Sequence, residues 1–301
     1  MSSLTGKVVL ITGAASGIGE ATALEVMSRG AITVLVDCDS APLARVAQKC
    51  GNSTTSFVAD ITDLNALQDA VRQTILHYGR IDIVFANAGI AAFGPLAHMD
   101  PLAWKRCVEV NVMGLFNTLH VALPELIQHR GYVLINASVS SFAHPPLMSA
   151  YAASKSAVEA IANSCRIEMS AHGVDVGVFY ASWVSTPLVT EGSLHPGFIK
   201  LRNTMPRLLN KEITPETAAA SIANGMEKRM VRIWLPGWVK YLFVFRSLLH
   251  LKIAEYPLRK VTPEIENIYL AGLASDGALA SCVGPREHAR LLAHMKDPKN
   301  D

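Results

Sequence analysis

The sequence has few cysteines, no concentrated charge and no leader-like start. Its five cysteines are odd in number and dispersed among 301 residues, which argues against a disulfide framework or a metal site and fits reduced thiols. The formal net charge of +2, with no dense Lys/Arg cluster, argues against nucleic acid as a partner. No charged segment precedes the short apolar run near the N-terminus, so no signal sequence is expected. These absences predict a cytoplasmic protein without a metal site.

Apolar, strand-like segments alternate with segments of helical length and period. The segments expected to be strands are 8–12, 32–37, 54–59, 81–86, 131–137, 174–180 and 231–235. This alternation predicts an α/β fold with a doubly wound, mainly parallel sheet and helices on both faces, which is a Rossmann-like architecture. We expect it to span residues 1–235, followed by a partly helical C-terminal extension over 236–301. In such sheets ligands bind beyond the carboxyl ends of the strands.

The first expected strand leads directly into a glycine-rich turn, Thr12–Gly19. Gly13 permits a tight turn, Gly17 lets the backbone approach a pyrophosphate, and Gly19 allows a helix to pack closely on the strand. The N-terminus of that helix then faces the phosphates. The next strand ends in Asp37, about where a dinucleotide-binding unit places the carboxylate that holds ribose hydroxyls.

Tyr151 and Lys155 lie four residues apart on an expected helix, and Ser138 precedes them. This spacing places a phenol and an ammonium on one helical face. A positive charge favours the phenolate, and each unit of pKa depression requires about 1.4 kcal/mol. The pair is therefore a candidate general acid/base, although the same spacing is common on solvated helices.

These features together resemble the short-chain dehydrogenase/reductase family over roughly residues 5–235. The order and spacing of the matching positions both fit, and these positions are Thr12–Gly19, Asp60-Ile61, Asn87-Ala88-Gly89, Asn111, Ser138, Tyr151 and Lys155. One departure is Ala181-Ser182, where many members carry Pro-Gly. Positions that match Val184 and Thr186 contact the nicotinamide carboxamide in the family, so this contact is expected to survive.

The resemblance implies a role for each candidate residue. Tyr151 would exchange a proton with the substrate oxygen, Ser138 would orient that oxygen, and Lys155 would lower the tyrosine pKa and hold the nicotinamide ribose. Asn111 would act through its backbone carbonyl, which anchors a water linking Lys155 to solvent; the alternative is a buried amide that kinks or caps its helix. The implied cofactor-binding set is Gly13, Ser16, Gly17, Ile18, Gly19, Asp37, Asp60, Ile61, Asn87, Ala88, Gly89, Tyr151, Lys155, Val184 and Thr186.

The implied activity is interconversion of a secondary alcohol and a ketone with NAD(H). Asp37 accepts hydrogen bonds from an unmodified ribose but repels a 2′-phosphate, and residues 14–16 and 38–43 contain no Arg or Lys to neutralise it. NAD is therefore expected over NADP. The alternative function is a non-catalytic dinucleotide sensor or scaffold on the same fold.

Residues 187–213 are expected to form an irregular, apolar lid that excludes water from the site. With Trp183 and the aromatic residues of the extension, this lid predicts a bulky apolar substrate such as a steroid, a retinoid or another lipid. The alternative is that these side chains are buried in the protein's own core, which would leave a cavity for a small or polar substrate.

The extension carries an amphipathic helical pattern whose apolar runs are too short to span a membrane. Its expected apolar face comprises Trp238, Tyr241, Leu242, Phe245, Leu248 and Leu249. Two interpretations remain, which are peripheral membrane contact through 236–253 and docking on the core or a partner subunit. The resemblance also implies a homodimer or homotetramer that pairs through helices near 100–129 and 149–172.

Overall fold

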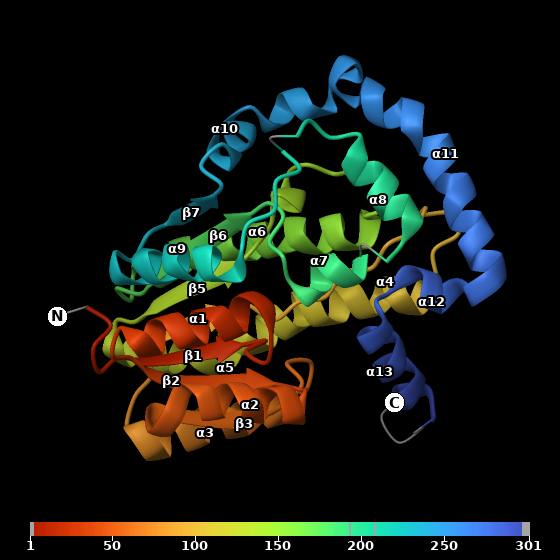
Figure 1. Cartoon of the computed structure of the whole chain (residues 1–301). Coiled ribbons are helices and arrows are strands. Elements are labelled where there is room, and N and C mark those ends of the chain that lie inside the picture. The colour runs from red at the N-terminus through yellow and green to blue at the C-terminus, as the bar shows by residue number, and fades with distance from the viewer. Residues whose placement is uncertain (1–2, 193, 208, 297–301) are drawn as a thin grey trace.

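A single seven-stranded sheet forms the centre of the molecule (Figure 1). The computed structural model describes residues 3–192, 194–207 and 209–296. The strands are β1 Val8–Thr12, β2 Ile32–Asp37, β3 Thr54–Val58, β4 Ile83–Ala86, β5 Tyr132–Asn136, β6 Asp175–Ala181 and β7 Arg232–Leu235. All neighbours pair in parallel, in the order β3-β2-β1-β4-β5-β6-β7. The predicted fold class is confirmed, and the predicted strand ends agree to within two residues.

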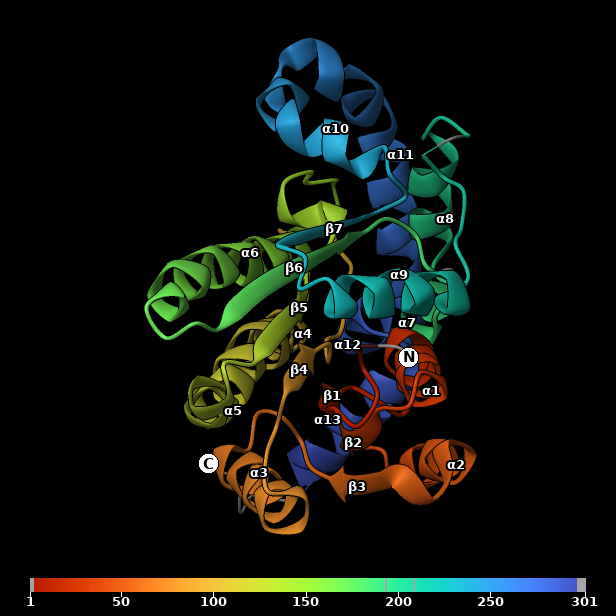
Figure 2. The same cartoon turned by 90° about the vertical axis from the view of Figure 1, so that its left-hand side faces the viewer.

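Helices cover both faces of the sheet, as Figure 2 shows. One layer contains α1 Gly17–Ser28, α2 Ser40–Cys50 and α9 Pro215–Glu227. The other contains α3 Leu64–Tyr78, α4 Pro101–Val108, α5 Gly114–His129 and α6 Ser149–Ser170. Successive strand residues serve opposite layers, so Val8 packs toward α3, α5 and α6 while Val9 packs toward α1, α2 and α9. Both faces are thus buried, which explains the continuous apolar runs of the strands.

The strand order reverses between β1 and β4. β1 pairs with β2 on one side and with β4 on the other, so the crossovers leave in opposite directions from this point. Such a switch point opens a crevice at the carboxyl ends of the strands. The fold therefore places the ligand site beside the glycine-rich turn.

Helices α4 and α5 are joined by a π-helical turn, Glu109–Met113, that contains Asn111. Short 3₁₀ turns also occur at Gly51–Ser53, Val139–Ser141 and Arg246–His250. Within the described part of the chain, the continuous helix 101–129 is long and apolar enough to cross a membrane by length and composition, but half of its most apolar stretch is buried in this fold. Such burial is typical of a core helix.

The segment predicted as an irregular lid contains two helices, α7 Pro187–Gly192 and α8 Pro196–Asn203. The prediction of irregular structure was wrong because Pro187 and Pro196 begin the helices instead of interrupting them, which is a position that tolerates proline. Behind the lid, Val184 forms an isolated parallel bridge with Ile213.

The C-terminal extension arches from β7 over α8 and returns past α4 (Figures 1 and 2). It comprises α10 Val239–Val244, the turn Arg246–His250, α11 Lys252–Asp276, α12 Ala278–Cys282 and α13 Pro285–Lys296. The predicted single apolar face is wrong. Trp238 and Leu242 pack against the core, whereas Tyr241 and Phe245 are exposed. The packed side of α10 includes Val239 and Phe243 instead of Tyr241, and beyond Val244 a 3₁₀ turn changes the angular spacing.

Candidate active site

The glycine-rich turn is held in a shape that only glycine permits. Gly13 has a φ of +66°, and a Cβ there would lie 2.7 Å from the Cα of Ala88. A Cβ on Gly19 would lie 2.0 Å from the carbonyl oxygen of Gly13, so helix α1 packs directly on the turn. The backbone is therefore free of side chains where a pyrophosphate would approach the N-terminus of α1.

Polar residues after β1, β4 and β5 tie these strand ends together. The Asn87 side chain donates hydrogen bonds to the carbonyls of Thr12 and Gly13 at 3.0 and 3.1 Å. The Asn136 side chain donates to the Asn87 side-chain oxygen at 2.9 Å. Asn136 in turn accepts a hydrogen bond on its backbone oxygen from Lys155 Nζ at 2.7 Å. This chain of contacts fixes Lys155 relative to the glycine-rich turn.

Two carboxylates follow β2 and β3. Asp37 accepts hydrogen bonds from the backbone N–H groups of Ala15 and Asp39, both at 3.0 Å, which orients it beside the turn. Burial raises the pKa of Asp60, but the Thr62 N–H and the charge of Arg106 outweigh this effect and hold the pKa of that carboxyl below its usual value. Asp60 is therefore a carboxylate at neutral pH.

Ser138, Tyr151 and Lys155 come together at the carboxyl end of β5. Ser138 precedes the 3₁₀ turn after this strand, and its hydroxyl forms a hydrogen bond with Tyr151. Tyr151 and Lys155 project from α6, and Lys155 Nζ lies 5.8 Å from the centre of the tyrosine ring. The residues thus occupy the mutual positions that a general acid/base and its partners need.

The expected depression of the tyrosine pKa is not what the structure gives. Burial raises the pKa of Tyr151 to about 12, against the hydrogen bond to Ser138, which lowers it. Burial also lowers the pKa of Lys155 to about 8. The two residues meet as their spacing predicts, but burial removes both groups from water and shifts both pKa values against the charged forms.

Asn111 acts on the neighbouring loop through its side chain. It accepts a hydrogen bond from the Ile90 N–H at 2.8 Å and donates to the Ile90 carbonyl at 2.9 Å and to the Ser154 hydroxyl at 2.8 Å. A cavity of about 10 Å³, close to what one water needs, is lined by Asn111, Lys155 and Asn136 among others. The side chain thus anchors the loop at Ile90, a role beyond the predicted kink or cap, and the water role stays a prediction.

Most of the predicted cofactor residues line one cleft of about 210 Å³. These are Gly13, Ser16, Gly17, Ile18, Asp37, Asp60, Ile61, Asn87, Ala88, Gly89 and Thr186. Of the remaining predicted residues, Gly19 and Val184 are buried behind the surface, and Tyr151 and Lys155 lie on α6. The cleft therefore joins the turn, the two carboxylates and the region predicted to hold nicotinamide.

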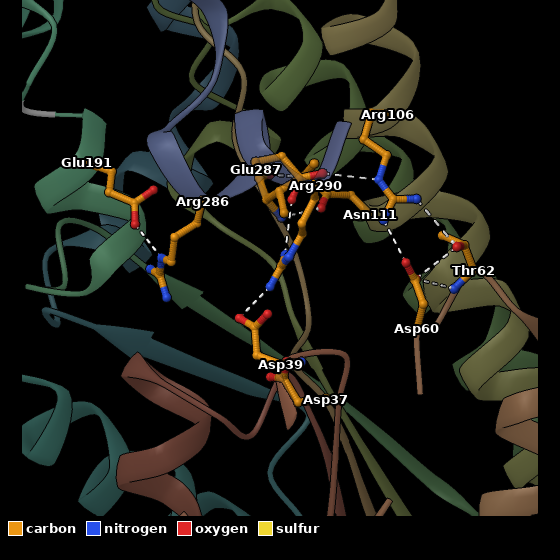
Figure 3. Close-up of polar contacts among 11 residues, drawn as sticks. Asp37, Asp39, Asp60, Thr62, Arg106, Asn111, Glu191, Arg286, Glu287 and Arg290 are labelled. Carbon is orange, nitrogen blue, oxygen red and sulfur yellow. Dashed lines mark hydrogen bonds and ion pairs between the residues drawn. The ribbon is translucent and has the colours of Figure 1, made fainter. Parts of the chain in front are cut away.

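Four residues that line the cleft come from the C-terminal extension, and sequence reasoning did not find them. They are Gly284, Arg286, Glu287 and Arg290, at the start of α13 or just before it. Figure 3 shows these α13 side chains pointing toward Glu191, Arg106 and Asp39. A local sequence signal for this contact is lacking, because Arg286 and Arg290 resemble ordinary charged residues on an amphipathic helix.

Apolar side chains gather beside Tyr151. Phe93, Met148 and Phe198 form a buried cluster against which Tyr151 and Trp183 pack. Trp183 meets the Phe198 ring edge-on with centroids 5.5 Å apart. The lid helix α8 thus contributes directly to the surroundings of the tyrosine.

A doubly wound sheet with a glycine-rich turn, a strand-end carboxylate and a Ser–Tyr–Lys group defines a Rossmann-type oxidoreductase. The family model described as short chain dehydrogenase matches residues 7–195. The chain belongs to the short-chain dehydrogenase family, and it is an oxidoreductase that acts on alcohol or ketone groups.

Relatives and solved structures agree with this assignment. The 11-beta-hydroxysteroid dehydrogenase-like 4A of Arabidopsis thaliana is 32% identical over 250 residues, which are 80% of this chain and 80% of the relative. The (-)-trans-carveol dehydrogenase of Rhodococcus erythropolis is 30% identical over 207 residues, 63% of this chain and 75% of the relative. The 3-ketoacyl-(acyl-carrier-protein) reductase of Brucella melitensis, complexed with NADH, superimposes with a TM-score of 0.70 at 27% identity over 77% of this chain and 97% of that chain.

Proposed function

We propose that this chain interconverts a secondary alcohol and a ketone with NAD(H), and that Tyr151 is the acid/base. The observation that carries the proposal is the meeting of Ser138, Tyr151 and Lys155 at the strand end next to the glycine-rich cradle. Tyr151 exchanges a proton with the substrate oxygen while the Ser138 hydroxyl orients that oxygen. When bound, the nicotinamide supplies or accepts the hydride.

The residues around the cleft fit a dinucleotide. The turn at Gly13 and Gly17 offers bare backbone to the diphosphate, and Asp37 is oriented for ribose hydroxyls. Lys155 Nζ is held at the carboxyl end of β5 by its hydrogen bond to the Asn136 backbone oxygen, and we assign it to the nicotinamide-side ribose. The similarity to the Brucella melitensis reductase, whose solved structure is complexed with NADH, supports the same cofactor class.

Replacing Tyr151 with Phe tests the assignment. We expect turnover to fall by about 10²–10⁴, while the dissociation constant for NADH stays within a factor of about three. A variant that keeps more than a few per cent of activity would refute the role. A wild-type protein that binds NADH but turns over no member of a broad panel of alcohols and ketones would favour the dinucleotide sensor or scaffold.

We further propose NAD in preference to NADP. Asp39, Asp60 and Glu287 pair with the two guanidinium groups of Arg106 and Arg290 in the cleft lining. Asp37 lines the same cleft and accepts hydrogen bonds only from backbone N–H groups, so it adds a fourth carboxylate. This surplus of negative charge repels a 2′-phosphate even though Arg290 is present. Tighter binding of NADPH than of NADH would contradict the proposal. Asp37→Ala should bring the dissociation constants for NADH and NADPH closer together.

A bulky apolar substrate is the class that the surroundings of Tyr151 favour. The cluster of Phe93, Met148 and Phe198 with Trp183 offers hydrophobic contact beside the reacting position. The names of the hydroxysteroid and carveol relatives are consistent with such substrates. We expect a higher kcat/KM for steroid or terpenoid alcohols than for short alcohols. Higher kcat/KM values for the short alcohols in a matched panel would rule out bulky apolar substrates.

The assembly that we propose is a homodimer or homotetramer in the cytoplasm. Met113 at the end of the π-helical turn and Phe116 on α5 are half exposed, and Ile167 on α6 is 70% exposed, which fits pairing through these helices. All five cysteines are free thiols, which is consistent with a reducing compartment. Phe116→Glu should reduce the mass found by light scattering, whereas a wild-type monomer at micromolar concentration would contradict the assembly.

We also propose peripheral membrane contact through 236–253. Tyr241, Phe245 and Leu248 are more than half exposed, and Ile253 is 83% exposed. Large apolar groups this exposed suit the headgroup boundary. The fraction of protein that co-sediments with anionic vesicles should fall for Ile253→Ser. It should not fall for the control Leu76→Ser, whose side chain on α3 is 72% exposed. Equal co-sedimentation of the two variants would exclude this contact.

A further inference from the structure

Helix α13 lies across the mouth of the cleft and contacts three separate elements around it. Arg286 pairs with Glu191 of α7, and Arg290 pairs with Asp39 after β2. Glu287 accepts a hydrogen bond from Arg106 of α4 at 3.1 Å. In Figure 3 the three side chains point in different directions from one helix, toward these partners. The helix is therefore fastened around the opening and not on one side only.

The central contact of α13 is buried. The Glu287 side chain is 7% exposed and pairs with both Arg106 and Arg290, each at 3.1 Å. Arg106 also binds Asp60 at 2.7 Å, so α13 is linked to the strand end that carries this predicted cofactor residue. Buried, charge-assisted pairs fix geometry far better than exposed ones. This arrangement sets the position of Arg290, whose side chain remains 30% exposed at the adenosine end.

The helix covers the cleft without filling it. A space of about 210 Å³ persists between the glycine-rich turn and the first residues of α13, and Arg286 and Arg290 line it. This volume is below the roughly 300–1,000 Å³ of common small-molecule sites. The cleft is therefore narrower than such a site, and outward movement of α13 or α7 would widen it.

We propose that α13 is the roof of the dinucleotide cleft, and that Arg286 and Arg290 are cofactor-binding residues contributed by the C-terminal extension. The roof lifts to admit the cofactor and then retains it, with the guanidinium groups facing the anionic adenosine diphosphate half. This inference rests on the proposed function, because it assumes that the cleft binds NAD(H).

The first test measures NADH dissociation by stopped-flow fluorescence and ADP-ribose affinity by displacement. For Arg290→Gln and Arg286→Gln we expect NADH to leave roughly 10- to 100-fold faster, the range for loss of one charge-assisted contact. The matched control is Arg259→Gln, which removes an exposed i,i+4 pair with Glu255 on α11. If NADH leaves both cleft variants no faster than the wild type, while the control has the wild-type rate, the proposal is overturned.

The second test locks the roof and keeps the proposal falsifiable if the arginine variants fold poorly. A Cβ built on Gly284 lies 3.0 Å from the Cβ of Glu191, close to the roughly 3.5–4.5 Å of a disulfide. The variant Glu191→Cys/Gly284→Cys is made with Cys38→Ser, because Cys38 is an exposed thiol near the cleft. The oxidised and reduced forms of this one protein are then compared.

We expect the oxidised, cofactor-free form to bind NADH at least tenfold more slowly than the reduced form. A form oxidised after loading should release NADH at least tenfold more slowly, and dithiothreitol should restore both rates. Equal rates in the two forms would overturn the proposal. Failure of the wild-type protein to bind NADH at all would instead defeat the proposed function, so the two failures are distinguishable.

Discussion

Replacing Lys155 with Met should make the cofactor-free protein more stable while it removes activity. Lys155 is 4% exposed, and its Nζ donates one hydrogen bond, at 2.7 Å, to the backbone oxygen of Asn136. Burial lowers the pKa of Lys155 from 10.5 to about 8, which means that the folded protein disfavours the charged form. Methionine has a similar length without the charge, so it relieves this cost.

The size of the effect follows from the pKa shift. A lowering from 10.5 to about 8 corresponds to about 3 kcal/mol, because one pKa unit is worth about 1.4 kcal/mol. Loss of the hydrogen bond to the Asn136 carbonyl offsets about 1 kcal/mol of this. We therefore expect the free energy of unfolding at pH 7 to rise by about 2 kcal/mol in Lys155→Met.

The pH dependence gives the prediction its sign. Below pH 8 the lysine is charged in both the folded and the unfolded state, so the wild type carries the full cost. Between pH 8 and 10.5 the folded state loses its proton first and the wild type gains stability relative to the variant. The advantage of methionine should therefore disappear before pH 10.5, and at that pH the wild type should be more stable by about 1 kcal/mol, the contribution of its hydrogen bond. Burial raises the pKa of Tyr151 to about 12, but this tyrosine is present in both proteins and its contribution cancels in their difference.

Urea unfolding at pH 7, 9 and 10.5 measures these differences. The control is Lys252→Met at an exposed position on α11, which should change the free energy of unfolding by less than about 0.5 kcal/mol at each pH. If Lys155→Met is less stable than the wild type at pH 7, or if the difference in their free energies of unfolding does not depend on pH, then burial does not disfavour the charged form of Lys155. Stabilisation combined with loss of turnover would mean that the lysine is retained for function at a cost in stability.

Two further substitutions test how the site is built. Asn111→Leu leaves the N–H and carbonyl of Ile90 without their partner. We therefore expect the free energy of unfolding, measured in urea, to fall by about 2–5 kcal/mol. A fall of less than about 1 kcal/mol would contradict the anchoring role. Gly19→Ala places a Cβ 2.0 Å from the Gly13 oxygen and should weaken NADH binding at least tenfold by calorimetry, whereas Gly237→Ala, with open space around it, should bind like the wild type. Equal NADH affinity in these two alanine variants would mean that the glycine-rich turn does not bind the dinucleotide.

The sheet and much of the cleft follow from local sequence patterns. β1 is an uninterrupted apolar run because both faces of the sheet are covered, and Asp37 is recognisable because it ends a strand of the same kind. Parallel strands bring their carboxyl ends to one edge, so residues far apart in sequence are placed together by topology alone. This is why Asp37, Asp60 and Asn87, which lie at the ends of three different strands, line one cleft.

The contacts of α13 and the energetics of Tyr151 depend on information that is not local. Arg106 and Glu287 are 181 positions apart, and neither occupies a motif position, so their contact depends on how the whole extension packs. The tyrosine pKa depends on burial, which is set by the lid and by α11 and α12 and not by the four-residue spacing to Lys155. Spacing therefore predicts which groups meet, whereas the surrounding fold decides their protonation.

The separation of Arg106 and Glu287 also has a consequence for synthesis. A ribosome adds about 5–20 residues per second, so Glu287 is made roughly 10–40 s after Arg106. During this interval the glycine-rich turn, Asp37 and Asp60 have all been made, but α13 has not. The emerging chain can thus present an open cleft to cellular nucleotide before the last helix arrives. If the cofactor binds during translation, α13 does not have to move away from the cleft, and the finished enzyme leaves the ribosome with its cofactor bound.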